Sequence, residues 1–126
     1  MKISVCLPQE KSRGFCFQAA KEYEKRLSRY CELVPVTGTS LKKPADFRIG
    51  ISSLGIGMSS EEMAARLSAL AIQNRRVWFF FGSKEEGLDE LWLLSGIVFK
   101  PDLQYVVLLE QIYRSFKIIS GEPYHK

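Results

Sequence analysis

Residues 77–81 constrain the fold of this chain more strongly than any other stretch of its sequence. The run reads Val-Trp-Phe-Phe-Phe and lacks the alternation of apolar and polar residues that marks a half-exposed strand. Such a strand is typical of the middle of a parallel sheet, because both of its faces are covered there. Strand and helix signals alternate along the rest of the chain, which predicts an α/β fold with a parallel sheet and helices on both faces.

The spacing of apolar residues predicts the remaining elements. Strands are expected at residues 1–7, 32–36, 47–51 and 96–99, with a short helical turn within residues 88–94. Helices are expected from residue 15 or 16 to residue 30, at residues 60–73 and at residues 103–119. Ser59 and Glu62 match a capping box for the second helix, and Gly121 matches a C-terminal cap for the third. No internal repeat is visible, so a single domain over residues 1–126 is expected.

The formal net charge of +4 allows an anionic partner such as RNA, but a charge of this size is also common in proteins that bind no nucleic acid. Lys21, Lys25, Arg26 and Arg29 lie opposite the apolar face of the first helix. That face is either solvated surface or a phosphate-contacting surface. No apolar stretch reaches the roughly 18–20 residues of a membrane span, and the first residues lack a signal-peptide pattern. A cytoplasmic protein without a membrane partner is therefore expected.

The three cysteines, Cys6, Cys16 and Cys31, are scattered and contain no Cys-x-x-Cys pair. Buried or half-buried thiols in a reducing cytosol are the simplest interpretation. A zinc site that joins them to His125 is formally possible, but its ligands lack the close spacing typical of such sites. We therefore expect no metal.

Residues 82–87 form a glycine-bounded loop directly after the apolar strand. The carboxyl ends of parallel strands are where α/β folds bind their ligands. The sequence Gly-Ser-Lys-Glu-Glu-Gly matches neither the Walker loop nor the dinucleotide-binding Gly-x-Gly-x-x-Gly motif. Taken alone, the loop is either a plain tight turn or a ligand-binding turn.

The end of the chain carries a family resemblance. Residues 110–118 read Glu-Gln-Ile-Tyr-Arg-Ser-Phe-Lys-Ile, and residues 121–126 read Gly-Glu-Pro-Tyr-His-Lys. Together with Glu-Tyr-Glu-Lys-Arg-Leu at residues 22–27, they resemble the RlmH family of SPOUT-class methyltransferases, which act on a pseudouridine of 23S ribosomal RNA. The resemblance covers nearly the whole chain and implies methyl transfer from S-adenosylmethionine to N3 of that pseudouridine. It also implies a C-terminal trefoil knot and a homodimer. Because the helix at residues 103–119 is apolar on nearly every side, we expect it to form part of the dimer interface.

The resemblance also implies which residues bind the cofactor. Gly82, Gly87 and Leu88 match the family's Gly-Gly-x-x-Gly-Leu loop, which lines the S-adenosylmethionine site, with Ser83 in place of the second glycine. In such a knot, main-chain groups at three strand ends hold the cofactor. By position, the cofactor-binding residues are Ile51, Gly82, Gly87, Leu94, Ser95, Gly96, Ile97, Val98 and Phe99.

Three residues near the C-terminus are the catalytic candidates. Tyr124 and His125 match the family's terminal Tyr-His pair, which reaches the cofactor pocket of the partner subunit. Histidine changes charge near neutral pH, so His125 is a candidate to orient N3 of the pseudouridine or to take its proton. Arg114 is the third candidate, and it either contacts the RNA backbone or pairs with Glu110 one helical turn earlier.

The chain also departs from the family. Pro101 stands where the family has a histidine, and Tyr105 stands where it has an arginine. The helices that family members carry near residues 37–45, and between the glycine loop and the last strand, have no counterpart in this sequence. A knot protein that binds RNA or ribosomes without methylating them is therefore the alternative function. An α/β interaction module with no nucleic-acid role is a third.

Overall fold

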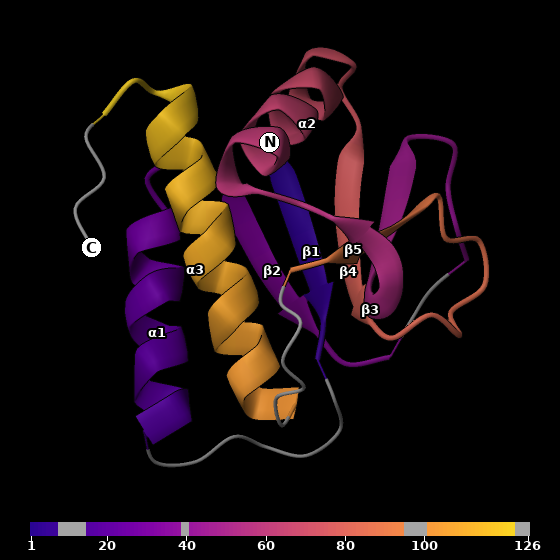
Figure 1. The fold of residues 1–126 in the computed structure, drawn as a ribbon, viewed down its shortest axis with the longest axis horizontal. Helices are drawn as coiled ribbons and strands as arrows, with labels where there is room; N and C mark the ends of the chain where they lie inside the picture. The colour runs from indigo at the N-terminus through magenta and orange to yellow at the C-terminus, as the bar shows by residue number, and fades with distance from the viewer. Residues whose placement is uncertain (8–14, 39–40, 95–100, 123–126) are drawn as a thin grey trace.

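The computed structural model describes residues 1–7, 15–38, 41–94 and 101–122 (Figure 1). Its elements, in chain order, are β1 (Lys2–Cys6), α1 (Phe15–Leu27), β2 (Glu32–Val36), β3 (Asp46–Gly57), α2 (Ser60–Ile72), β4 (Arg76–Phe81), β5 (Glu90–Leu93) and α3 (Pro101–Ile119). Helices and strands alternate except at two places, where β3 follows β2 directly and β5 follows β4.

The strands form one parallel sheet of five in the order β2-β1-β4-β3-β5. β4 contains the apolar run and pairs with β1 on one side and β3 on the other, which confirms its predicted central position. Val77 of β4 lies in register with Ile3 of β1 and with Phe47 of β3. Phe79, two residues further along β4, is completely buried. The predicted parallel α/β sheet is therefore confirmed.

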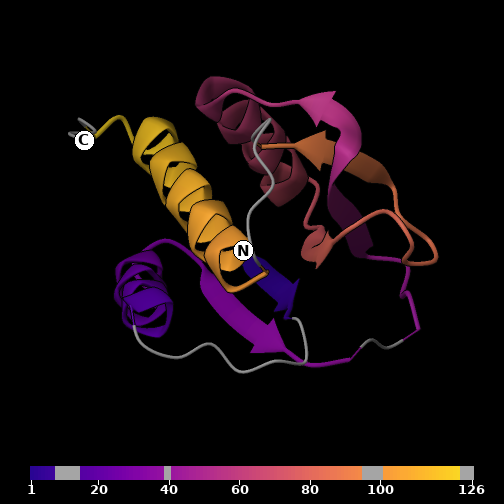
Figure 2. The same ribbon diagram turned by 60° about the horizontal axis from the view of Figure 1, so that its bottom comes forward.

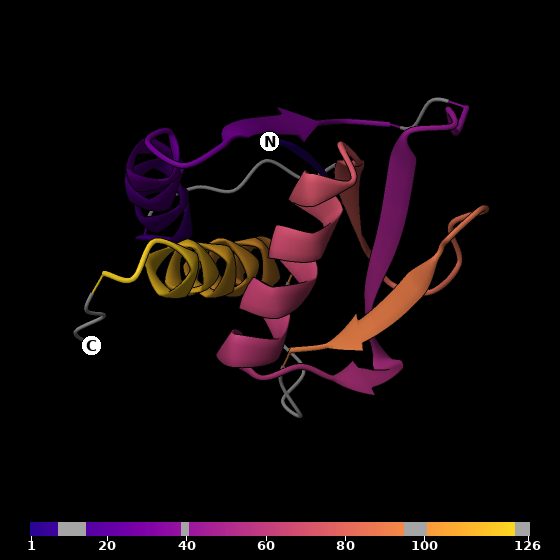
Figure 3. The same ribbon diagram turned by 90° about the horizontal axis from the view of Figure 1, so that it is seen from above.

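All three described helices pack against one face of this sheet (Figures 2 and 3). α3 lies between α1 and α2, and a single apolar core joins the helices to the strands. The core includes Leu27 of α1, Leu67 of α2, Leu108, Leu109 and Ile112 of α3, and Ile3, Val5, Ile49, Val77 and Phe79 of the sheet. The expectation of helices on both faces is wrong for the described residues. Residues 37–45 and 82–89, which connect consecutive strands, are shorter than the dozen or so residues that a crossover helix needs.

Aromatic and loop residues cover part of the opposite face, which we call the helix-free face. Trp78 and Phe80 of β4 stack there with 5.9 Å between their ring centroids. The guanidinium group of Arg48 on β3 lies over both rings, and Arg48 is only 3% exposed. Residues 82–89 lie over the same face, because Glu85 and Glu86 contact the Arg48 side chain.

The region from β3 to β5 differs from the sequence prediction. β3 continues to Gly57 instead of ending at Ile51, and residues 90–93 form a strand instead of a helical turn. β3 pairs with β5 with a break in register between Ile51 and Ile56. A Cβ atom on Gly55 would lie 2.6 Å from main-chain atoms of Leu91 and Trp92, so glycine is needed where the two strands approach. The strand expected at residues 96–99 lies outside the described residues.

The predicted caps are present at the start of α2 and at the end of α3. The Ser59 hydroxyl accepts a hydrogen bond from the Glu62 amide and the Glu62 carboxylate accepts one from the Ser59 amide, which confirms the capping box of α2. α3 ends in a Schellman motif, in which the amides of Gly121 and Glu122 donate to the carbonyls of Ile118 and Lys117. α1 ends at Leu27, earlier than predicted, and residues 28–30 form a turn.

The trefoil knot stays a prediction, because residues 95–100, which join β5 to α3, lie outside the described part of the chain. Within the described part, no helix has the length and apolar character that a membrane span requires. The same residues contain no group of three or more His, Cys, Asp or Glu side chains placed to hold a metal ion. Cys6, Cys16 and Cys31 are free thiols, and burial raises the pKa of Cys31 to about 11.

Candidate cofactor site

An open cleft of about 730 Å³ lies where the second half of β3, the loop after β4 and strand β5 meet. Its apolar wall consists of Leu54, Ile56, Met58, Leu88, Leu91 and Trp92, and Gly55 also lines it. Its polar lining consists of Arg66, Ser83, Glu85, Asp89 and Glu90. The cleft therefore lies at the predicted glycine loop and at the carboxyl end of β3, the position where parallel α/β folds bind ligands.

The glycine loop, residues 82–87, is joined to the end of β3 by a main-chain hydrogen bond. The Gly82 amide donates to the Ile51 carbonyl at 2.8 Å. Gly82 has a φ of +107°, a value that side chains with a Cβ atom rarely adopt, so glycine is required at this position. Two of the predicted cofactor-binding residues, Ile51 and Gly82, are thereby joined where β3 and β4 lie side by side. Of residues 82–88, it is Ser83, Glu85 and Leu88 that line the cleft, and the predicted residues Ile51, Gly82 and Gly87 are not among the described residues that line it. Leu94 is half-buried and packs against the core.

Arg48 of β3 and Lys42, in the loop before β3, hold Asp89, which follows the glycine loop. The Asp89 amide donates to the Arg48 carbonyl at 2.7 Å, and the Arg48 amide donates to the Asp89 carboxylate at 2.8 Å. Lys42 adds an ion pair to Asp89 at 2.7 Å. Burial acts to raise the pKa of Asp89, but the hydrogen bonds from Lys42 and from the Arg48 amide outweigh it, so the pKa is lowered. Asp89 is therefore ionised beside the cleft at neutral pH.

A second carboxylate in the cleft is held in one orientation. Arg66 of α2 donates two hydrogen bonds to Glu90, at 3.2 and 2.8 Å, and the indole N–H of Trp92 donates a third at 2.9 Å. Sequence analysis did not assign Arg66, Glu90 or Trp92 to the site. The alternation of polar and apolar residues in Glu-Leu-Trp-Leu at positions 90–93 is a strand signal that could have identified this wall.

The C-terminal tail begins at a well-anchored residue. Glu122 accepts hydrogen bonds from Lys117 at 2.7 Å, from the Tyr30 hydroxyl at 2.9 Å and from Ser120 at 3.0 Å. These bonds, with Lys117 the largest contributor, lower the pKa of Glu122 to about 2. Tyr124 and His125 lie outside the described residues, but the chain is fixed to α3 and to the turn after α1 two residues before Tyr124.

The pH dependence of this anchor can be predicted from the pKa of Glu122. Because the folded-state pKa is lowered from 4.5 to about 2, the stabilisation is complete above about pH 4.5 and is lost as the pH falls toward 2. We expect Glu122→Gln to unfold at a lower urea concentration than the wild type at neutral pH, and at the same concentration near pH 2. Glu32→Gln, at an exposed carboxylate of β2, is the control. A wild-type advantage over Glu122→Gln that persists undiminished to pH 2 would contradict the assignment.

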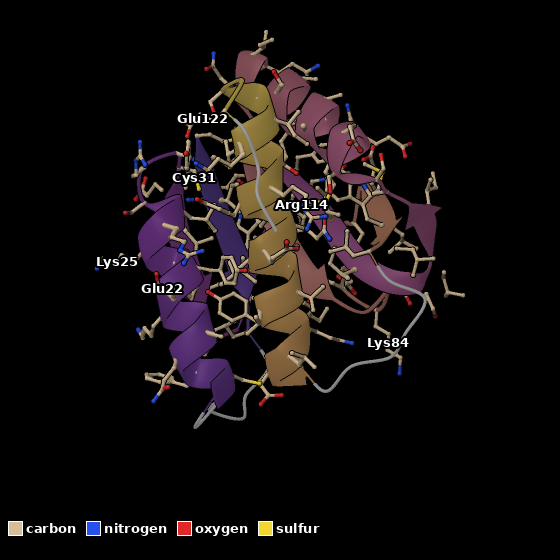
Figure 4. The ribbon with its side chains drawn as sticks, turned by 60° about the vertical axis from the view of Figure 1, so that its left-hand side comes forward. Glu22, Lys25, Cys31, Lys84, Arg114 and Glu122 are labelled. Atoms are coloured by element: carbon tan, nitrogen blue, oxygen red, sulfur yellow. The ribbon has the colours of Figure 1, made fainter. Side chains whose placement is uncertain are left out.

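Two residues of α3 have partners outside the cleft. Arg114 forms an ion pair of 2.7 Å with Glu110, so the intrahelical alternative for this residue is present, while a contact with RNA stays a prediction. Figure 4 shows Arg114 midway along α3, and Lys84 extending outward from the glycine loop. Tyr105, at the position of the family's arginine, donates a hydrogen bond of 3.2 Å to Glu24 of α1. Tyr105 therefore connects α3 to α1.

Seven of the predicted site residues cannot be placed. Ser95, Gly96, Ile97, Val98 and Phe99 fall in the segment between β5 and α3, and Tyr124 and His125 fall in the tail, all outside the described residues. The described part of the site is therefore the glycine loop, the end of β3 and the wall formed by β5.

The parallel sheet, the glycine loop and the cleft define an α/β protein with a cleft at the position where such folds bind ligands, and sequence comparison identifies its class. A family model described as a predicted SPOUT methyltransferase matches residues 37–125. The chain belongs to this SPOUT methyltransferase family. The chain is 32% identical to ribosomal RNA large subunit methyltransferase H 1 of Thermoanaerobacter sp. (strain X514), over the full length of both proteins. It is similarly 31% identical to ribosomal RNA large subunit methyltransferase H of Acetivibrio thermocellus and 28% identical to that of Clostridioides difficile, again over both full lengths.

Proposed function

We propose that this protein is an S-adenosylmethionine-dependent methyltransferase that modifies N3 of a pseudouridine in 23S ribosomal RNA. The observation that carries the proposal is the cleft of about 730 Å³ at the glycine loop, in a chain that belongs to the SPOUT methyltransferase family. The names of the full-length relatives, which describe methyltransferases of large-subunit ribosomal RNA, support the choice of substrate.

The described side chains of the cleft fit this cofactor. Leu54 and Ile56, whose side chains are exposed, offer apolar surface for an adenine ring, and the carboxylates of Glu85 and Asp89 favour a ligand with positively charged groups. S-adenosylmethionine carries both an adenine and a cationic sulfonium, and when bound it supplies an electrophilic methyl group. We assign its main-chain contacts to Ile51, Gly82, Gly87 and Leu94, together with residues 95–99.

The protein's own task in this reaction is to bind the RNA and prepare its nucleophile. N3 of a pseudouridine belongs to a weakly acidic imide, so its proton must leave before N3 can attack. We assign removal or orientation of this proton to His125, assisted by Tyr124, since a positioned base is worth about 10²–10⁴-fold in rate. Arg114 is half-buried on α3 and is assigned to the RNA backbone, because a guanidinium group can bind phosphate while it keeps its ion pair with Glu110.

A homodimer is part of this proposal. The C-terminal end of α3 lies on the opposite side of the subunit from β3 and β5, which line the cleft (Figures 1 and 3). Residues 123–126 can extend at most about 14 Å. This arrangement favours the cleft of a partner subunit as the destination of the tail. Exposed apolar residues at the end of α3, Ile118 and Ile119, support an interface there, although α1 and α2 already bury much of the rest of this helix.

The dimer predicts a specific effect of charge at the end of α3. Light scattering should give the wild type the mass of two chains of 14.4 kDa at micromolar concentration. The double change Ile118→Glu and Ile119→Glu should give a folded monomer, because two carboxylates would have to enter the interface. Ile72→Glu is the control, since Ile72 is another exposed isoleucine at the end of a helix. A monomeric wild type, or a dimer unaffected by the double change, would contradict this interface.

Two measurements test the proposed function. Titration calorimetry with S-adenosylmethionine should show binding at one site per chain. Labelled methyl groups should then be incorporated into ribosomes from a strain that lacks its own enzyme for this position. Binding of the cofactor and of ribosomes without any incorporation would support the alternative of a protein that binds ribosomes without methylating them.

A further inference from the structure

Arg48 is an unusual residue for the interior of a small protein. It lies on β3, on the helix-free face, and only 3% of it is exposed. Arginine is almost never buried to this degree without partners that satisfy its charge and its hydrogen-bond donors. Its guanidinium group lies 5.7 Å from the ring centroid of Trp78 and 5.4 Å from that of Phe80, so the two stacked rings form one side of its surroundings.

The described polar contacts of the Arg48 side chain lead to the glycine loop. Its Nη1 atom lies 3.4 Å from the carbonyl oxygen of Glu86 and 3.7 Å from the carboxylate of Glu85. The main chain of Arg48 exchanges two hydrogen bonds with Asp89, which follows the loop. One residue of β3 therefore holds the sequence 85–89 through its side chain and its main chain.

The helix-free face explains why the loop needs this support. In the described residues no helix packs over residues 82–89, so the loop cannot gain its order from helix packing. Ordering a free loop costs conformational entropy at every residue. The rigid, planar guanidinium group of Arg48 loses little freedom when it binds, because Trp78 and Phe80 already hold it in place.

We propose that Arg48 is a positioning residue that holds residues 82–89 in the conformation that binds the cofactor. Glu85 and Asp89, two of its partners, line the cleft, so movement of the loop would change the shape and charge of the cleft together. The role in cofactor binding rests on the proposed function, whereas the ordering of the loop does not depend on it.

The test compares Arg48→Met, Arg48→Lys and Arg75→Met. Methionine keeps an apolar stem over Trp78 and Phe80 but removes the charge and the donors, while lysine keeps the charge without the planar group. Arg75 is the matched control, because it too holds main-chain carbonyls, those of Ala45 and Asp46, and lies over a ring, that of Phe47. Its hydrogen bonds are at Ala45 and Asp46, where β3 begins, and it acts on residues 82–89 only through its charge, which contributes to the lowered pKa of the Asp89 carboxyl.

The first measurement is amide hydrogen exchange by NMR without any cofactor. The Gly82 and Asp89 amides, which donate to the carbonyls of Ile51 and Arg48, report opening of the loop. We expect exchange at both amides to become about 10- to 100-fold faster in Arg48→Met. This is the change in the opening equilibrium that corresponds to losing a hydrogen bond made by a charged group. Arg48→Lys should lie between this variant and the wild type, and Arg75→Met should match the wild type at both amides. Unchanged exchange in folded Arg48→Met would overturn the proposal.

The second measurement is the affinity for S-adenosylmethionine by calorimetry. It should fall by about 10- to 100-fold in Arg48→Met and remain unchanged in Arg75→Met. Equal affinity in the wild type and Arg48→Met, despite faster loop exchange, would also overturn the positioning role. A wild type that binds no cofactor would instead contradict the proposed function, while the exchange data would still test loop ordering. If Arg48→Met does not fold, Glu85→Gln and Arg48→Lys provide the same comparison, with a smaller expected acceleration at both amides.

Discussion

Removal of residues 123–126 is expected to abolish methyl transfer to ribosomes while the fold and the cofactor affinity remain. The truncation leaves Glu122 in place, so its hydrogen bonds to Lys117, Tyr30 and Ser120 continue to hold the end of α3. Circular dichroism and calorimetry with S-adenosylmethionine should therefore match the wild type, and only the chemical step should be lost.

Single substitutions in the tail separate its two possible contributions. If His125 removes the proton from N3, His125→Ala should lower the rate constant for methyl transfer by about 10²–10⁴-fold, and Tyr124→Phe should have a smaller effect. If the tail only positions the RNA, both changes should cost comparably little. The measurement is incorporation of labelled methyl groups into ribosomes that lack the modification. Full activity of the truncated protein would show that the tail has no part in the reaction.

Gly82→Val is expected to eliminate binding of S-adenosylmethionine. The φ of +107° at Gly82 would strain a valine by about 1–3 kcal/mol, and its side chain would enter the loop where the cofactor must approach. A Cβ atom at this position meets no other atom within 4 Å, so the core itself should not be disturbed. Loss of affinity in a folded protein, measured by calorimetry, is the expected result.

Gly38→Val is the matched control for this experiment. Gly38 has a φ of +80° and equally open surroundings, but it follows β2, at the opposite edge of the sheet from β5. Both variants should lose a similar free energy of unfolding through backbone strain, and only Gly82→Val should lose affinity. Wild-type affinity in a folded Gly82→Val protein would place the cofactor site elsewhere.

Several elements were predictable because their signals are local. The apolar run at residues 77–81 identified the central strand, since a strand of this composition needs cover on both faces. Ser59 and Glu62 identified the start of α2, and Gly121 identified the end of α3, because caps are formed by residues within one turn of each other. The glycine loop was assigned to the cleft from its position after a parallel strand and from its resemblance to the SPOUT family.

The cleft wall was not predictable in the same way. Residues 52–57 contain two serines and two glycines and were not predicted as a strand, yet they extend β3, and β5 pairs with the end of this extension. Among the described residues, the helix-free face lacks helices because the connections at residues 37–45 and 82–89 are too short to contain one. Their lengths are visible in the sequence, but the sequence does not show which face of the sheet they leave without a helix. Glu90 is held in the cleft because Arg66 of α2 reaches its carboxylate across the fold, and the indole N–H of Trp92 donates to the same carboxylate.

The sequence by itself determined the α/β class, the central strand, the helix caps and the family, because periodicity, caps and motifs act over a few neighbouring residues. The tertiary structure alone decided that one sheet face has no helix in the described residues and that Arg48 contacts residues 85–89. It also decided that Gly55 lies against the main chain of Leu91 and Trp92. These contacts join residues more than thirty positions apart, and their energy depends on how the strands pair and not on any local pattern.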